Sequence, residues 1–282
     1  MRLCLGPREF DVTHRALVMG ILNRTPDSFY DRGETWDFDA FLDKADRIVT
    51  EGADILDVGG VKAGPGPEVS EAEELDRVVP AVEALVARFD VPVSADTWRS
   101  GVLRAACEAG AVIGNDISGF ADTKYLEVAA AAGASVVATH IRLRPRVPDP
   151  EPEYGDLVGE VCRFLLDRAG QAEHAGIPAH RVILDAGLDL GKTPAQSAVL
   201  LRESRRLAQL GYPLLLSASN KRFLGELFGL EIDNRGPESL TCVAFGVMHG
   251  CRIVRVHDVT GSLRVVRMVE AMLAAEESDD DG

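Results

Sequence analysis

Short apolar runs and amphipathic stretches alternate along the whole chain. The first apolar run, residues 17–22, reads Leu-Val-Met-Gly-Ile-Leu and is followed at once by a polar segment. An unbroken apolar run of this length is typical of a parallel strand that is covered on both faces. Residues 38–51 then carry apolar side chains at helical spacing and are followed by Gly52, a residue that commonly ends a helix. These two segments predict one strand-helix unit.

The same unit recurs to the end of the chain. Further strands are predicted at residues 53–58, 91–95, 111–114, 134–139, 181–184, 214–217 and 253–256. Further helices are predicted at residues 70–88, 99–109, 123–132, 154–175, 194–210, 222–228, 237–249 and 262–275. Strand-helix units repeated in one chain of 282 residues predict an α/β fold with a single (β/α)8 TIM barrel.

The barrel is predicted to span residues 15–275. Residues 1–14 are predicted to form an N-terminal extension, a small hairpin or strand that caps the bottom of the barrel. Residues 276–282 combine acids with Ser and Gly. This segment is too polar to be buried, and we expect it to be disordered.

Acidic residues outnumber basic ones, with 45 Asp+Glu against 30 Lys+Arg and a formal net charge of −15. Such a surface repels phosphate backbones and anionic membranes, so we expect neither nucleic acid nor a membrane as a partner. No signal peptide is recognisable, and no apolar run reaches the roughly 18 residues of a membrane-spanning helix. The five cysteines are scattered and never form C-x-x-C. We therefore expect a cytoplasmic protein without a disulfide framework or a zinc site.

Every predicted strand is followed by polar residues, which in a (β/α)8 barrel would gather at one mouth. The side chains at these positions are Asn23, Asp57, Asp96, Asn115, His140, Asp185, Lys221 and Arg255. Any one of them is also a common cap or turn residue, and Lys221 or Arg255 is equally suited to an ordinary ion pair. The whole set is harder to explain by caps alone and therefore predicts a binding site.

The strand-end residues suit a ligand with two chemical halves. Adjacent acceptors and donors that fit the edge of a heterocycle are provided by Asp96, Asn115, Asp185 and Lys221. Asn23, Arg255 and His257 offer donors for a phosphate or pyrophosphate, with Asn23 able to hold a divalent cation. A heterocycle that carries a diphosphate leaving group would use both halves.

Several motifs in this chain closely resemble those of the dihydropteroate synthase family. They are, in order, G-I-L-N-R-T-P-D-S-F, D-V-G-G, D-T-W, N-D-I-S-G, L-D-A-G-L-D-L-G-K-T, S-N-K and R-V-H-D-V. The resemblance extends from about Arg15 to the final helix. It implies a (β/α)8 barrel, usually a homodimer, that acts in folate biosynthesis. Such enzymes join 6-hydroxymethyl-7,8-dihydropterin pyrophosphate to p-aminobenzoate and release pyrophosphate in the presence of Mg²⁺.

The resemblance also implies roles for individual residues. The family's pterin-binding positions correspond to Asp96, Asn115, Asp185 and Lys221, and its pyrophosphate-binding positions to Asn23, Arg255 and His257. Asn23 is the implied Mg²⁺ ligand. The family's mechanism passes through a pterin methylene cation, so the implied catalytic residues are Asp96, Asp185 and Lys221, with Asp27 on a loop that closes over the cation.

The side that would hold the aromatic amine departs from the family pattern. Its implied residues are Thr25, Pro26, Lys62, Leu190, Ser219 and Asn220. The family usually has E-S-T-R-P after D-V-G-G, whereas residues 61–65 read V-K-A-G-P, and Lys62 is the candidate to replace the arginine. In the family motif D-P-G-x-G-F-G-K, the second Gly is Asp189 here and the Phe is Leu190; in S-R-K, the Arg is Asn220. These differences are similar to those of a divergent second paralogue of actinobacteria.

Three functions are therefore compatible with the sequence. The first is a dihydropteroate synthase, or a related transferase that uses another amine. The second is a catalytically silent pterin-binding paralogue. The third is a pterin-dependent methyltransferase, against which the T-P-D-S-F, S-x-K and R-V-H-D motifs count. A protein that only binds pterin has no use for the leaving-group residues, so the sequence favours the transferase.

Overall fold

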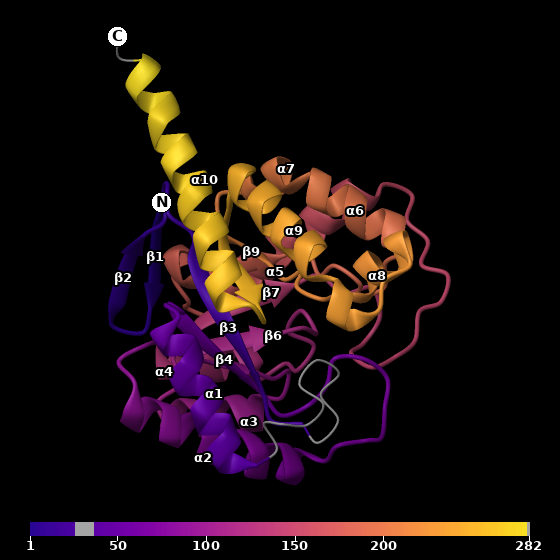
Figure 1. Cartoon of the computed structure of the whole chain (residues 1–282). Coiled ribbons are helices and arrows are strands. Elements are labelled where there is room, and N and C mark those ends of the chain that lie inside the picture. The colour runs from indigo at the N-terminus through magenta and orange to yellow at the C-terminus, as the bar shows by residue number, and fades with distance from the viewer. Residues whose placement is uncertain (26–36, 281–282) are drawn as a thin grey trace.

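A closed barrel of parallel strands forms the centre of the molecule. The computed structural model describes residues 1–25 and 37–280, and within this part eight strands close into a barrel in the order β10-β3-β4-β5-β6-β7-β8-β9. Each strand pairs in parallel with the next one along the chain, and β10 closes the ring against β3. Figure 1 shows the helices arranged around this barrel. The predicted (β/α)8 fold is confirmed.

The strands are short and almost fully buried, as the apolar runs predicted. They are β3 (Leu17–Asn23), β4 (Ile55–Gly59), β5 (Val93–Asp96), β6 (Ile113–Asp116), β7 (Ser135–Thr139), β8 (Val182–Asp185), β9 (Leu214–Leu216) and β10 (Cys251–Val256). Successive side chains point to opposite faces of a strand. Leu17 and Met19 of β3 therefore join the cluster inside the barrel, whereas Val18 and Leu22 join the larger cluster between the strands and the helices.

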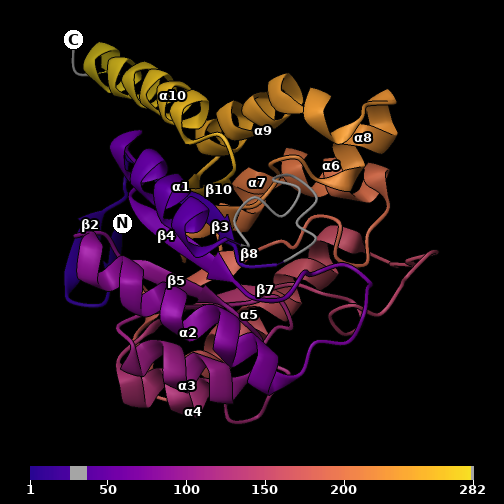
Figure 2. The same ribbon diagram turned by 60° about the horizontal axis from the view of Figure 1, so that its bottom comes forward.

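The helices form the outer layer. They are α1 (Phe38–Thr50), α2 (Glu71–Arg88), α3 (Ser100–Glu108), α4 (Tyr125–Ala132), α5 (Leu157–His174), α6 (Pro194–Arg202), α7 (Ser204–Ala208), α8 (Arg222–Phe228), α9 (Gly236–Met248) and α10 (Val259–Asp280). Two short 3₁₀ turns, η2 (Ala179–Arg181) and η3 (Ile232–Asn234), lie between them. Figure 2 shows α2, α3 and α4 side by side on one flank of the barrel.

Two helices, α2 and α6, begin with side chains that cap their first backbone N–H groups. The Ser70 hydroxyl accepts a hydrogen bond from the Glu73 backbone N–H at 3.2 Å, at the start of α2. A capping box formed by Thr193 and Gln196 opens α6. Each cap satisfies N–H groups that have no partner within the helix. The caps therefore stabilise the starts of α2 and α6, next to the loops that follow β4 and β8.

The N-terminal residues form an antiparallel hairpin of β1 (Arg2–Leu5) and β2 (Arg8–Asp11). Leu3 and Leu5 are fully buried in the cluster inside the barrel. The hydroxyl of Ser135, the first residue of β7, donates a hydrogen bond of 2.5 Å to the Cys4 carbonyl. The hairpin thus closes the barrel at the end where the strands begin.

Two segments differ from the sequence-based expectations. The helix predicted at residues 194–210 is divided at Glu203 into α6 and α7. Helix α10 continues to Asp280, so residues 276–280 are helical where disorder was predicted. Ala and Glu, which fill positions 274–277, are strong helix formers and extend the last helix. Within the described residues, no helix is long and apolar enough to cross a membrane.

Candidate active site

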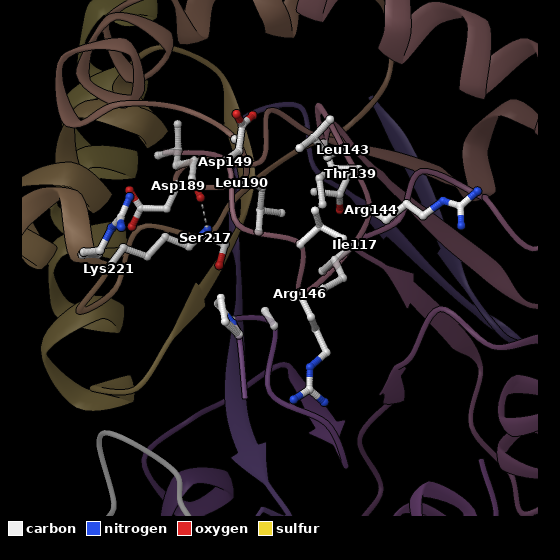
Figure 3. A pocket seen from close by; sticks show the side chains of 18 of the residues that line it. Ile117, Thr139, Leu143, Arg144, Arg146, Asp149, Asp189, Leu190, Ser217 and Lys221 are labelled. Atoms are coloured by element: carbon white, nitrogen blue, oxygen red, sulfur yellow. Dashed lines mark hydrogen bonds between the residues drawn. The ribbon is translucent and has the colours of Figure 1, made fainter. Parts of the chain in front are cut away.

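A cavity of about 450 Å³ opens at the carboxyl ends of the strands. Figure 3 shows side chains from several strand ends and loops that surround it. Polar residues at or near the ends of the strands line the cavity, among them Asp96, Asn115, Thr139, Asp185, Ser217, Lys221 and Arg255. All four residues predicted to bind pterin therefore lie around one cavity. Leu190, predicted on the side of the amine, also lines it.

Arg255 holds two strand-end carboxylates together. Its Nε donates to Asp57 Oδ2 at 2.6 Å and its Nη2 to Asp96 Oδ2 at 2.7 Å. The Asn115 amide donates to both carboxylate oxygens of Asp57, at 3.3 Å each. Asp57 is fully buried, and its charge is compensated by these donors. The sequence placed Asp57 at a strand end but gave it no role, and it predicted Arg255 as a pyrophosphate ligand without these partners.

Burial in this network changes the acidity of Asp96. Desolvation raises the pKa of Asp96 to about 7; Arg255 opposes this shift, and the neighbouring carboxylates Asp57, Glu74 and Asp116 add to it. Burial also acts on Arg255, but the nearby carboxylates outweigh it and raise the pKa of the guanidinium above its ordinary value. Arg255 is therefore always charged, whereas Asp96 can gain or lose a proton near neutral pH.

A second pair of charged side chains lies at the end of β8 and after β9: Asp185 is buried and Lys221 is half-buried. Asp185 Oδ1 accepts a hydrogen bond of 2.7 Å from the Gly187 backbone N–H, and Lys221 Nζ donates to the Leu188 carbonyl at 2.7 Å. Burial raises the pKa of Asp185 and lowers the pKa of Lys221, and in each case the opposite charge of the other residue opposes the shift. This arrangement places a hydrogen-bond acceptor and a donor at the floor of the cavity.

Lys192 ties the loops after β7 and β8 together from below the cavity. The side chain is 1% exposed, and Nζ lies 2.8 Å from His140 Nδ1 and 2.8 to 3.1 Å from the carbonyl oxygens of His140, Gly187 and Leu190. A Cβ on Gly187 would lie 1.9 Å from the His140 carbonyl oxygen, so glycine is required for this close approach. Lys192 belongs to a motif read from the sequence, but no role had been predicted for it.

His140 is part of this buried arrangement and not a free base. Burial, reinforced by the neighbouring Lys192, lowers the pKa of His140 to about 3. Its ring lies edge-on to Phe164, with 4.8 Å between the ring centroids. His140 therefore stays neutral at physiological pH and supports the loop.

Three loop residues at the mouth adopt left-handed backbone conformations, with φ of 67° at Arg146, 70° at Asp189 and 55° at Asn220. Asp and Asn tolerate this conformation better than other non-glycine residues. Asp189 also accepts a hydrogen bond of 3.2 Å from the Phe223 backbone N–H at the start of α8. Asp189 therefore forms a left-handed turn and adds a contact to the next helix.

Ser219, Asn220 and His257 form a separate cluster. Ser219 Oγ lies 3.0 Å from His257 Nδ1, and the backbone N–H of Asn220 donates to Ser239 Oγ at 3.0 Å. Ser219 and Asn220 line a smaller neighbouring cavity of about 140 Å³. None of Ser219, Asn220 and His257 is among the residues that line the larger cavity, so the structure does not bring these three predicted residues together with Lys221 around it.

The remaining predicted residues lie at the edge of the site or outside the described chain. Asn23 is the last residue of β3, Thr25 is buried, and Lys62 precedes the residues Ala63, Gly64 and Pro65 that line the cavity. Pro26 and Asp27 fall outside the described residues, so their predicted roles stay predictions.

A metal site made of protein side chains alone is not found in the described part of the chain. There, no group of three or more His, Cys, Asp and Glu side chains could hold a metal ion. Asn23 alone would supply one amide oxygen. Mg²⁺ is commonly held by one or two protein oxygens together with substrate phosphates and water. Asn23 therefore fits an ion that arrives with a diphosphate, and not a permanently bound one.

The known proteins that this chain resembles fit the geometry of the site. The model of a family described as pterin binding enzyme matches residues 19–257. The chain is 42% identical over 276 residues to inactive dihydropteroate synthase 2 of Mycobacterium leprae. The alignment covers 96% of this chain and 94% of that protein. It is also 37% identical over 279 residues to dihydropteroate synthase of Escherichia coli, in an alignment that covers 99% of both chains.

Solved structures give the same result. Dihydropteroate synthase of Yersinia pestis, in a sulfonamide drug complex, superposes with a TM-score of 0.93 at 38% identity and covers 98% of this chain and 100% of its own. Dihydropteroate synthase of Xanthomonas albilineans with 4-aminobenzoic acid has a TM-score of 0.88 at 37% identity, with 97% and 98% of the chains covered.

Proposed function

Because the chain belongs to the family of pterin-binding enzymes, we propose that it is a transferase of the dihydropteroate synthase type. It joins 6-hydroxymethyl-7,8-dihydropterin pyrophosphate to an aromatic amine, p-aminobenzoate or a relative of it, and releases pyrophosphate in folate biosynthesis. The observation that carries the proposal is the convergence of Asp96, Asn115, Asp185 and Lys221 on one cavity that also contains Arg255. A neutral heterocycle with donors and acceptors along one edge matches these groups.

The pterin is held at the floor of the cavity. The carboxylates of Asp96 and Asp185 accept hydrogen bonds from its amino and ring N–H groups, and the Lys221 ammonium donates to its carbonyl oxygen. Asn115, fixed by Asp57, can both accept and donate. Because Asn115 and Asp185 are buried and Asp96 and Lys221 are half-buried, a ligand that fails to pair with them would leave polar groups unsatisfied, and this selects for the pterin.

The reaction breaks the C–O bond between the pterin methylene group and the diphosphate and forms a C–N bond to the amine. Pyrophosphate leaves with the bonding electron pair, and the amine nitrogen attacks the methylene cation. The amine nitrogen then gives its extra proton to the released pyrophosphate or to water. The carboxylates of Asp96 and Asp185 stabilise the cation as it forms. A fixed charge at such a position lowers the free energy of the transition state by on the order of 3 kcal/mol.

The leaving group needs positive charge and hydrogen-bond donors. Arg255 supplies a permanent charge, and we assign Asn23 and His257 to the diphosphate with it. Mg²⁺ would be held by Asn23 and the diphosphate oxygens, where it would neutralise the charge of the departing pyrophosphate. Asn23 orients this end of the substrate from the last position of β3.

We also propose that the enzyme works in the cytoplasm as a homodimer. Apolar side chains exposed on two helices support pairing: Phe228 of α8 is 62% exposed, and Met268 and Met272 of α10 are 61% and 45% exposed. Met268 and Met272 are four residues apart and lie on one face of their helix. All five cysteines are free, which supports a reducing compartment.

Pyrophosphate release tests this function. The enzyme is mixed with pterin pyrophosphate and Mg²⁺, with and without p-aminobenzoate, and pyrophosphate is measured over time. Release that depends on an aromatic amine is the expected result. Release that no aromatic amine accelerates would contradict the transferase proposal. Release that only amines other than p-aminobenzoate accelerate would change the second substrate but not the reaction.

A second candidate function is binding of the pterin without catalysis. It is favoured by the similarity to the inactive synthase of Mycobacterium leprae and by the residues 61–65 and Leu190 on the amine side. This candidate predicts that calorimetry detects tight binding of the pterin pyrophosphate while no amine produces pyrophosphate release.

A further inference from the structure

A second large cavity lies at the end of the barrel where the strands begin. It has a volume of about 350 Å³ and is bounded by Thr13, which precedes β3, by the end of α7 and by the turn from α9 into β10. Because β3 and β10 run toward the candidate active site, the residues at their starts lie at the opposite end of the barrel. This cavity is therefore separate from the candidate active site, and its role does not depend on the proposed function.

The cavity gathers positive charge in an acidic protein. Arg205, Arg252 and His249 line it, whereas none of the described residues that line it is acidic. Acids outnumber bases by 45 to 30 in the whole chain, so this lining runs against the composition. The neighbouring Asp11 does not line the cavity, and its carboxylate accepts hydrogen bonds from Thr13. The cavity therefore attracts an anion.

Backbone carbonyls hold the Arg252 guanidinium in place without neutralising its charge. Its Nε donates to the Thr13 carbonyl at 3.1 Å, and its Nη1 donates to the carbonyls of Val247 and Cys251 at 3.1 Å each. Burial lowers the pKa of Arg252, and the nearby Cys251 and Glu270 oppose this shift only in part. Its Nη2 makes no hydrogen bond to any described residue, so one end of a fixed guanidinium is available to a ligand.

Arg205 and His249 add two further groups from the adjacent helices. Arg205 is an exposed residue of α7, and its side chain has neither an ion pair nor a hydrogen-bond partner among residues 1–25 and 37–280. The His249 ring stacks on Phe245 with 4.0 Å between the centroids, and its Nδ1 donates to the Phe245 carbonyl at 2.8 Å. His249 Nε2 is therefore the ring atom that a ligand can use. It accepts a hydrogen bond from a protonated phosphate oxygen or, when the ring is charged, donates one.

The wall of the cavity depends on a glycine in the turn between α9 and β10. Gly250 has a φ of 99°, and a Cβ at this position would lie 2.6 Å from the Cβ of Ala208. Glycine thus allows the turn to approach α7 closely. Ala208 and Met248 supply an apolar part of the wall, and Gln209 supplies an amide. The volume of the cavity falls within the range of roughly 300 to 1,000 Å³ that is typical of small-molecule sites.

We propose that this cavity binds a small phosphate monoester through its phosphate group. Arg205 and Arg252 bind the phosphate oxygens through charge-assisted hydrogen bonds, for which the guanidinium fork is well suited. A phosphate group alone would not fill about 350 Å³, so the ester carries a polar organic part that contacts Gln209 and Met248. A nucleic acid is disfavoured as the source of the phosphate, because a protein with a formal net charge of −15 repels a polyanion.

Calorimetry in a phosphate-free buffer tests this site with inorganic phosphate, with glucose 6-phosphate and with glucose as the uncharged control. The wild type is compared with Arg205→Ala and with the matched control Arg206→Ala. Arg206 is the next residue of α7, is also exposed and does not line the cavity. Both phosphates are expected to bind, glucose 6-phosphate at least as tightly as inorganic phosphate, whereas glucose is not. Arg205→Ala should weaken the binding of both by about tenfold, and Arg206→Ala should stay within about twofold of the wild type.

Rescue and independence from the active site complete the test. Arg205→Lys should retain part of the affinity for both phosphates, because the charge returns without the planar fork. The affinity of Arg205→Ala for pterin pyrophosphate should equal that of the wild type, since the two cavities lie at opposite ends of the barrel. These measurements need no turnover, so the site can stand if the transferase proposal fails. No saturable binding of either phosphate, or equal effects of the two alanine variants, would overturn the proposal, as would phosphate binding that only pterin pyrophosphate displaces.

Discussion

At the scale of single residues, the strongest expectation concerns Asp185. Its carboxylate is buried, faces Lys221 and accepts a hydrogen bond from Gly187. Asp185→Asn keeps the shape but replaces a charge-assisted acceptor by a neutral one. We expect pterin affinity in calorimetry to fall by about tenfold or more. The exposed Asp167→Asn serves as the control, and an unchanged affinity of the Asp185 variant would show that the pterin does not occupy this cavity.

Asp96 should make pterin binding depend on pH. Its pKa is raised to about 7, first by burial and then by neighbouring carboxylates. If the carboxylate form accepts hydrogen bonds from the pterin, protonation removes an acceptor, so affinity should be greatest above about pH 7 and fall as the pH is lowered through that value. Calorimetry across this range measures the effect. Asp96→Asn should bind more weakly with a flat profile, and a wild-type affinity that rises at low pH would contradict the assignment.

The individual residues show where sequence-based prediction of the site ends. Asp96, Asn115 and Asp185 could be found because each one ends an apolar run, and the ends of parallel strands meet at one mouth. The pairing of Arg255 with Asp57 could not be found from the sequence, because it depends on the distance between two strands of the closed barrel that are not neighbours. Lys192 lies in a recognisable motif, but only its carbonyl partners in the fold reveal its role.

At the scale of elements, the loops after β7 and β8 depend on one buried side chain. Lys192→Met fills the same space but leaves the carbonyls of His140 and Leu190 without their donor and removes one of the two donors to the Gly187 carbonyl. Unsatisfied buried acceptors should reduce the free energy of unfolding by about 1 to 3 kcal/mol or more. They should also raise the KM for the amine more than the KM for the pterin. Urea denaturation and steady-state kinetics measure the two effects.

The exposed Lys124→Met is the matched control for this variant. Lys124 precedes α4, and its side chain makes no capping hydrogen bond there. If Lys192→Met and Lys124→Met unfold at the same urea concentration, Lys192 does not hold the two loops.

The elements themselves were largely predictable, and their irregular parts were not. Apolar runs and helical spacing placed the barrel strands, but neither signal marks the break at Glu203 or the left-handed turn at Asp189. Such turns are set by contacts with other elements, here a hydrogen bond from Phe223. The outer wall of the cavity consists of loops of this kind, so the choice of amine is the least predictable property.

At the scale of the whole molecule, the N-terminal hairpin and the candidate active site lie at opposite ends of the barrel. Leu5 of the N-terminal hairpin is fully buried among the side chains inside the barrel. Leu5→Ala should lower the free energy of unfolding by about 2 to 5 kcal/mol, through lost burial and the cavity that remains. The affinity for pterin should stay within about twofold of the wild type, because the hairpin lies at the end away from the site.

Urea denaturation and calorimetry test this separation, with Leu166→Ala as the control because Leu166 is 44% exposed on α5. A Leu5 variant as stable as the control would show that the hairpin does not contribute to the barrel core. A large loss of pterin affinity in a folded Leu5 variant would show that the two ends are not independent.

The proposed function is that this barrel joins a pterin to an aromatic amine. Mass spectrometry of the product can test it: the enzyme is incubated with pterin pyrophosphate, Mg²⁺ and p-aminobenzoate together with other aromatic amines. We expect a new species in which the pterin methylene group is bonded to an amine nitrogen, formed by the wild type and strongly reduced in Asp185→Asn. Intact pterin pyrophosphate as the only pterin species, in a sample that calorimetry shows to bind it, would contradict the proposed function.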